Sequence, residues 1–129
     1  MTPNTTTTPS ALIVEDEAIL LMLVAETLRD AGYQVYEAGD GMAAVHILET
    51  HPEIDIMISD IRMPGMSGYE VTRAALTLRP GLKVVLMTGY TEEAIPQNIA
   101  NAGIRVLRKP FDIEQLPQLA KSVLDRHAD

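Results

Sequence analysis

The chain has 129 residues, which suits one compact domain, and 47% of them are hydrophobic, which is enough to fill a core. It contains no cysteine, which excludes disulfides and thiolate metal sites and fits the reducing cytoplasm that we expect as its location. The formal net charge is -8 and the basic residues are scattered, which argues against nucleic-acid binding because phosphates require a basic patch. No segment has the length and apolar character of a membrane span, and the N-terminus lacks the pattern of a secretion signal.

Residues 1–10 predict a disordered tail, because a polar segment rich in Thr and Pro cannot offset its ordering entropy by burial. From residue 11 onward, apolar strand-like runs alternate with helical patterns in one domain, residues 11–129. The predicted strands are residues 11–14, 34–37, 54–59, 83–87 and 105–107. The predicted helices are residues 17–31, 41–50, 69–78, 95–102 and 112–127. This alternation predicts an α/β fold, a doubly wound five-stranded parallel sheet with helices on both faces.

Two prolines interrupt the predicted helices. Pro96 predicts that the fourth helix starts late, and Pro117 predicts loosened or kinked first turns in the last helix, because proline donates no backbone hydrogen bond. The methionines are expected to fill the core or loops, at positions 22, 42, 57, 63, 66 and 87.

Polar side chains follow four of the predicted strands. Glu15 and Asp16 come after the first strand, Asp60 after the third, Thr88 after the fourth and Lys109 after the fifth. In a parallel α/β sheet these ends meet at one edge, where ligands bind. Two like charges about 4 Å apart cost about 4 kcal/mol at an effective dielectric constant of about 20, so three acids together need a counter-charge. Lys109 offsets part of the repulsion, and Mg²⁺ suits such an all-oxygen site.

Each of these positions, taken alone, has a simpler explanation. Asp60 fits an ordinary turn, and Glu15 and Asp16 fit the start of a helix, where acids are favoured. Their joint placement at the ends of the strands of one sheet favours a site. Thr88 and Lys109 then offer a hydroxyl donor and a point charge, which suit the oxygens of a phosphate group.

Four segments of the chain resemble the signature segments of a known family, the receiver domain of bacterial two-component response regulators. These segments are LIVEDE, SDIRMPGMSG, LMTGY and RKPF, and the resemblance extends from residue 11 to about residue 127. It implies the flavodoxin-like strand order 2-1-3-4-5 and a signalling function without enzymatic activity beyond self-phosphorylation and autodephosphorylation. It also implies a partner, a sensor histidine kinase or a histidine phosphotransfer protein, and a monomer or weak dimer.

The resemblance also assigns roles to the polar residues at the strand ends. Asp60 is expected to be the phosphoacceptor and to bind Mg²⁺ together with Asp16 and the backbone carbonyl of Arg62. Glu15 is expected to assist through a bound water.

The phosphoryl group itself is expected to meet two further residues. Thr88 is expected to donate a hydrogen bond to its oxygens, and Lys109 to form an ion pair with them. The peptide bond between Lys109 and Pro110 is expected to be cis, which would aim the lysine into the pocket.

Several positions depart from the pattern of the family. Glu15 stands where aspartate is more common, and Val106 stands where many receivers carry a switch aromatic. Tyr90 is then either a gate over the pocket or an exposed loop tyrosine. Pro96 and Pro117 predict an unusual shape for the surface that receivers generally use for output.

Three alternatives remain beside a stand-alone receiver, which is favoured because the sequence stops where the last predicted helix ends. A receiver taken from a hybrid histidine kinase or multidomain regulator has the same appearance. A phosphatase with an aspartyl nucleophile usually needs a second acid two residues further on, where this chain has Arg62. A flavin or nucleotide carrier usually has a Gly-rich loop after its first strand, where this chain has acids that repel phosphate.

Overall fold

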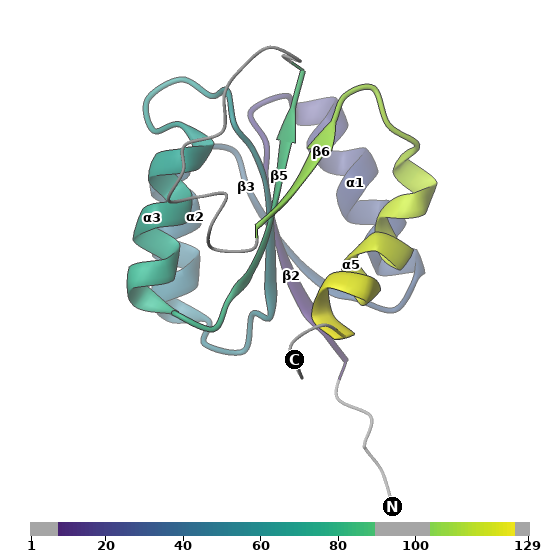
Figure 1. Ribbon diagram of the computed structural model, residues 1–129, viewed down its shortest axis with the longest axis horizontal. Helices are drawn as coiled ribbons and strands as arrows, with labels where there is room; N and C mark the ends of the chain where they lie inside the picture. Colours follow the sequence, from purple (N-terminus) through teal and green to yellow (C-terminus); the bar gives the residue numbers. More distant parts are fainter. Residues whose placement is uncertain (1–7, 90–103, 126–129) are drawn as a thin grey trace, which may run out of the picture.

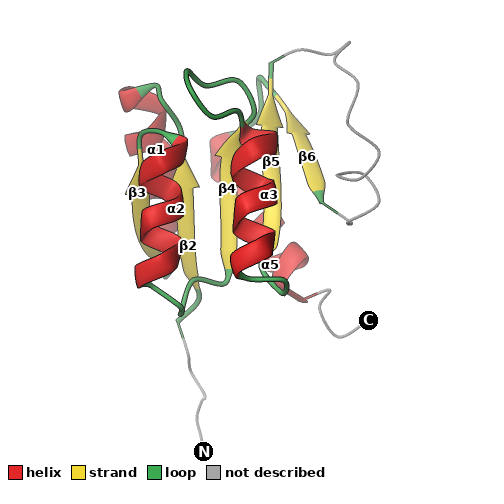
Figure 2. Ribbon diagram, turned by 90° about the vertical axis from the view of Figure 1, so that its left-hand side faces the viewer, coloured by secondary structure: helices red, strands yellow, loops and turns green. Residues whose placement is uncertain are grey.

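Five parallel strands form one sheet within residues 8–89 and 104–125, the part of the chain that the computed structural model describes. The strands are β2 (Ser10–Val14), β3 (Gln34–Ala38), β4 (Ile56–Asp60), β5 (Lys83–Thr88) and β6 (Arg105–Arg108). Their order across the sheet is β3-β2-β4-β5-β6 (Figure 2), which is 2-1-3-4-5 in chain order. The predicted fold and strand order are therefore confirmed.

Helices cover both faces of this sheet. The described helices are α1 (Ala18–Asp30), α2 (Gly41–Thr50), α3 (Gly68–Leu78), the 3₁₀ turn η1 (Ile113–Gln115) and α5 (Leu116–Asp125). Figure 1 shows α1 and α5 on one face of the sheet and α2 and α3 on the other. The predicted helix at residues 95–102, with Pro96, lies outside the described residues.

The core consists of two apolar layers, one on each face of the sheet. Successive side chains of a strand point to opposite faces, so each central strand contributes to both layers. In β2, for example, Ile13 packs toward α1 and α5, whereas Leu12 packs toward α2 and α3. The strands β2 and β4 are buried along their whole length, as a parallel sheet covered on two sides requires.

Some element boundaries differ from the prediction for local reasons. β2 begins at Ser10, one residue inside the predicted tail, because Ser10 already pairs with Gln34 of β3; its backbone N–H also donates to Asp55 Oδ2 at 2.9 Å. β4 begins at Ile56 rather than at residue 54, although Ile54 is fully buried in the core. Residues 1–7 of the predicted tail lie outside the described part of the chain.

The segment around Pro117 confirms that the last helix starts irregularly. The 3₁₀ turn Ile113–Gln115 precedes α5, and Asp112 caps this turn by accepting a hydrogen bond from the backbone N–H of Glu114. Pro117 is the second residue of α5, where a missing N–H costs little, and its carbonyl accepts a hydrogen bond from the Tyr33 hydroxyl.

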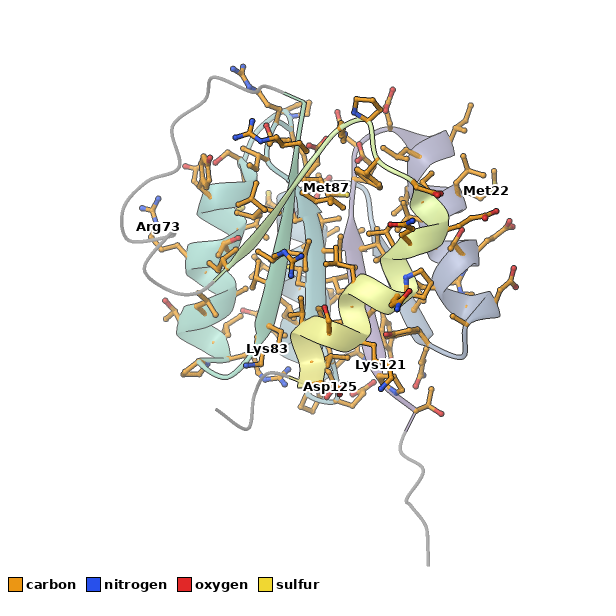
Figure 3. The ribbon with its side chains drawn as sticks, turned by 45° about the vertical axis from the view of Figure 1, so that its right-hand side comes forward. Met22, Arg73, Lys83, Met87, Lys121 and Asp125 are labelled. Carbon is orange, nitrogen blue, oxygen red and sulfur yellow. The ribbon has the colours of Figure 1, made fainter. Side chains whose placement is uncertain are left out.

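The prediction for the methionines is wrong at two positions. Met57 and Met87 are fully buried, but the exposed fractions of Met22 and Met42 are 49% and 77%. Figure 3 shows Met22 on the outer side of α1. The buried residues of α1 begin at Val24, and Met22 does not lie on that inward face.

None of the described helices is both long enough and apolar enough to cross a lipid bilayer.

Candidate functional site

The strands all end at the same edge of the sheet (Figure 2). The polar residues predicted from the sequence lie at these strand ends. Glu15 directly follows β2, Asp60 ends β4, Thr88 ends β5 and Lys109 directly follows β6. The backbone N–H of Lys109 donates to the carbonyl of Thr88 at 2.7 Å, which ties these two strand ends together. The backbone N–H of Glu15 is held in the same way by Ala38 at the end of β3.

Three carboxylates meet at this edge. One oxygen from each of Glu15, Asp16 and Asp60 lies within 4.8 Å of the other two. Their burial differs: the exposed fraction is 1% for Glu15 and 6% for Asp60, whereas Asp16 is exposed. The cluster therefore has two acids in the protein interior and one at its rim.

Lys109 is the counter-charge of this cluster. Its Nζ lies 3.2 Å from Asp60 Oδ2, to which it donates a hydrogen bond, and 3.5 Å from Glu15 Oε1. Burial alone would lower the pKa of Lys109, but the charges of Asp60 and Glu15 outweigh it, so the pKa is raised. Lys109 therefore stays charged at neutral pH. Its peptide bond to Pro110 is cis, as predicted.

Glu15 is the acid of this cluster whose pKa is raised. Burial raises the pKa of Glu15 to about 7; the charge of Asp60 adds to the rise, whereas the backbone N–H of Glu17 and the charge of Lys109 oppose it. Glu15 Oε2 accepts the hydrogen bond from Glu17 at 3.1 Å. Glu15 Oε1 is buried and accepts no hydrogen bond from the described residues.

These observations fit a divalent cation. Glu15 Oε1 has the charge of Lys109 Nζ 3.5 Å away but no hydrogen bond, and a buried carboxylate oxygen in this state is better satisfied by a cation in direct contact. The donor set consists of carboxylate oxygens, which are the ligands that Mg²⁺ prefers. A bound cation would also favour the charged form of Glu15, whose pKa is raised without it.

The loop after Asp60 is held at both ends. At its start, the backbone N–H of Ile61 donates to the carbonyl of Met87 on β5 at 2.9 Å. At its end, Ser67 and Glu70 form a capping box that starts α3. Between these two ends of the loop, Gly65 adopts a φ of +78°, a backbone conformation that residues with a Cβ rarely adopt.

Three further residues that were predicted from the sequence lie in the described part of the chain, and one does not. Thr88 is buried at the end of β5. It directly follows Met87, which pairs with Asp60 of β4. Val106 is partly buried and packs against the core layer on the α2 and α3 face. The side chain of Arg62 is exposed, and the role of its carbonyl stays a prediction. Tyr90 lies outside the described residues.

Two residues that the sequence analysis did not single out lie against the backbone of Asp60. The Ser59 hydroxyl donates to the carbonyl of Asp60 at 2.9 Å, and the Cα of Gly68 approaches the same carbonyl closely. One signal in the sequence was available: a glycine directly after the capping residue Ser67, at a helical position where glycine is unfavourable.

Comparison with known proteins gives the same picture. The family described as response regulator receiver domain matches residues 11–121. The chain is 36% identical over 119 residues to the sensor kinase CckA of Brucella abortus, covering 91% of this chain but only 13% of that protein. It is 31% identical to the sporulation initiation phosphotransferase F of Bacillus subtilis, covering 88% of this chain and 91% of that one.

A solved structure agrees with the fold. The CheY-like response regulator receiver domain protein of Methanospirillum hungatei superposes with a TM-score of 0.84 at 29% identity, covering 95% of this chain and 98% of that one. The family match spans most of the chain, and it includes the acidic cluster and Lys109. The chain therefore belongs to the response regulator receiver domain family.

Proposed function

We propose that this receiver domain accepts a phosphoryl group on Asp60 from the phosphohistidine of a sensor histidine kinase or a histidine phosphotransfer protein. The position of Asp60 carries the proposal: a buried carboxylate at the end of β4, 3.2 Å from Lys109 Nζ and clustered with two further acids. Phosphoryl transfer depends mainly on positioning and on charge stabilisation, which this arrangement offers.

In the proposed step, a carboxylate oxygen of Asp60 attacks phosphorus and forms an O–P bond. The P–N bond to the donor histidine breaks, and its electron pair returns to the imidazole. The ammonium of Lys109 neutralises charge on the incoming group, and the Thr88 hydroxyl donates to its oxygens. Water later attacks the phosphorus, which releases inorganic phosphate and restores the carboxylate of Asp60. We propose no enzymatic activity beyond these two reactions.

The acids of the pocket also have a proposed metal role. Asp16, Asp60 and the backbone carbonyl of Arg62 would hold Mg²⁺, and Glu15 would act through a bound water. When bound, the cation supplies charge neutralisation at the phosphoryl oxygens. The cluster of three carboxylates, whose charge Lys109 offsets only in part, supports this assignment.

Mass spectrometry of the intact protein after incubation with Mg²⁺ and acetyl phosphate tests the proposal. We expect the mass to increase by one phosphoryl group in the wild type and to stay unchanged in Asp60→Asn. Lys109→Ala should still bind Mg²⁺, because lysine is not a ligand, but should lose the structural response to phosphorylation. Unchanged labelling of Asp60→Asn would place the acceptor at another residue.

The ion pair between Lys121 and Asp125 provides matched controls. These residues lie 3.1 Å apart on α5, are largely exposed, and sit at the opposite end of the molecule from the strand ends (Figure 3). Asp125→Asn and Lys121→Ala should therefore label as the wild type does. Turnover of a generic phosphate ester would instead favour the phosphatase alternative.

For output, we propose regulation through protein–protein contact by a stand-alone receiver in the cytoplasm, with a receiver inside a larger kinase or regulator as the alternative. The matched relatives include a short protein and a long one: the chain spans 91% of the sporulation phosphotransferase but 13% of the sensor kinase. The mass of the intact protein isolated from its own cells distinguishes these two architectures.

A further inference from the structure

We propose that Ser59 and Gly68 are positioning residues for the phosphoacceptor, and this inference rests on the proposed function of Asp60. Together they hold the backbone from Asp60 to Arg62 in one conformation. The carboxylate of Asp60 and the carbonyl of Arg62, both proposed metal ligands, then keep fixed positions at the edge of the sheet.

Gly68 brings the start of α3 into direct contact with the end of β4. A Cβ at this position would lie 2.4 Å from the carbonyl oxygen of Asp60 and 2.7 Å from the Cα of Ile61, closer than real Cβ atoms approach other atoms. Both of these atoms belong to the backbone, so no side-chain rotation can relieve the clash. Only glycine therefore permits this approach of α3 to the strand end.

The same contact includes a hydrogen bond. The backbone N–H of Gly68 donates to the carbonyl of Ile61 at 2.7 Å. That carbonyl belongs to the peptide group that joins Ile61 to Arg62. The hydrogen bond therefore fixes the orientation of the peptide group directly before the carbonyl of Arg62.

Ser59 fixes the preceding peptide group. Its side chain is fully buried, and its hydroxyl donates to the carbonyl of Asp60 at 2.9 Å. The N–H of the same peptide group belongs to Ile61 and donates to Met87 of β5. Both polar atoms of the peptide group that follows the phosphoacceptor are thus bonded, one to a hydroxyl and one to the next strand.

The fixed positions of the Asp60 carboxylate and the Arg62 carbonyl matter for Mg²⁺ binding and phosphoryl transfer, and not only for folding. Mg²⁺ requires near-octahedral coordination, so a shifted carbonyl or carboxylate weakens its binding. A reacting atom misplaced by about 1 Å costs about 100-fold in rate. A Cβ at Gly68 requires a backbone shift of a few tenths of an ångström or more, because real contacts of this kind exceed 3.0 Å. The shift has to occur at the contact between the start of α3 and the backbone of Asp60 and Ile61.

The test compares Ser59→Ala and Gly68→Ala with two matched controls. Ser122→Ala removes a hydroxyl that donates to a backbone carbonyl within α5, and Gly81→Ala adds a Cβ that meets no atom within 4 Å. Circular dichroism first establishes that each variant folds. Phosphorylation by acetyl phosphate is then followed over a range of donor and Mg²⁺ concentrations.

For Gly68→Ala we expect the maximal phosphorylation rate to fall about 10- to 100-fold and the Mg²⁺ concentration for half-maximal rate to rise. For Ser59→Ala, the milder change, we expect a fall of about 3- to 10-fold in maximal rate at an unchanged half-saturating donor concentration. A purely structural role would lower the unfolding midpoint but leave these constants of the folded protein unchanged. Both controls should retain wild-type constants.

The outcomes separate the two proposals. Folded Ser59→Ala and Gly68→Ala proteins with wild-type rates and Mg²⁺ dependence would overturn the positioning role while Asp60 remained the acceptor. A wild-type protein that does not label at Asp60 would overturn the proposed function, and the positioning role with it.

Discussion

Replacing Glu15 with glutamine tests how much the ionisation of this buried acid lowers the free energy of unfolding. In the metal-free protein the pKa of Glu15 is raised to about 7, whereas its value in the unfolded chain is near 4.5. Between these pH values the native state keeps a proton that the unfolded state has lost. The stability that depends on Glu15 is therefore fully present below pH 4.5 and is lost as the pH rises to about 7.

The size of this effect follows from the pKa values. A change from 4.5 to about 7 corresponds to about 3 kcal/mol of unfolding free energy. Glutamine has nearly the same shape as protonated glutamate but does not ionise. Relative to the wild type, Glu15→Gln should therefore gain about 3 kcal/mol on going from acidic to neutral pH.

Urea unfolding followed by circular dichroism measures this difference in a chelating buffer at a series of pH values. Saturating Mg²⁺ should reduce this gain of Glu15→Gln at neutral pH, because the cation binds the charged wild-type site more tightly and stabilises it by mass action. If the difference between wild type and Glu15→Gln does not change between pH 4.5 and 7, the reasoning about the buried charge is wrong.

Two further predictions concern α3. Thr72 is fully buried and its hydroxyl makes no hydrogen bond to any described residue, so the isosteric Thr72→Val should stabilise the protein by about 1 kcal/mol. Lower stability in thermal or urea unfolding would mean that the hydroxyl has a partner. Ser67→Ala removes the capping box with Glu70 and should cost about 1 kcal/mol. An unchanged unfolding free energy would show that this cap contributes nothing to stability.

Much of the fold was predictable because its signals are local. The central strands are short, almost entirely apolar runs, and a capping residue or a glycine stands near most helix ends, as Asp40 does before α2. The helix α2 was predicted with its observed bounds. The strand ends were then enough to predict that Glu15, Asp60 and Lys109 lie together, because parallel strands end at one edge.

What the sequence did not reveal depends on tertiary contacts. Nothing local distinguishes Glu15 from Asp16, yet one is buried beside Lys109 and the other is exposed. The exposure of Met22 depends on which face of α1 meets the sheet, and that face is set by the whole layer rather than by the residue. The contact of Gly68 with Asp60 spans a loop whose path no short pattern specifies.

The pocket takes its side chains from the ends of four strands that are widely separated along the chain: Glu15, Asp60, Thr88 and Lys109. An isolated fragment that lacks any one of these strands therefore cannot assemble it. Under the proposed function, labelling of Asp60 thus reports cooperative folding, because only molecules in which these four strands are assembled acquire the phosphoryl group. The same assay would measure the intact fraction of a preparation after heating, proteolysis or storage.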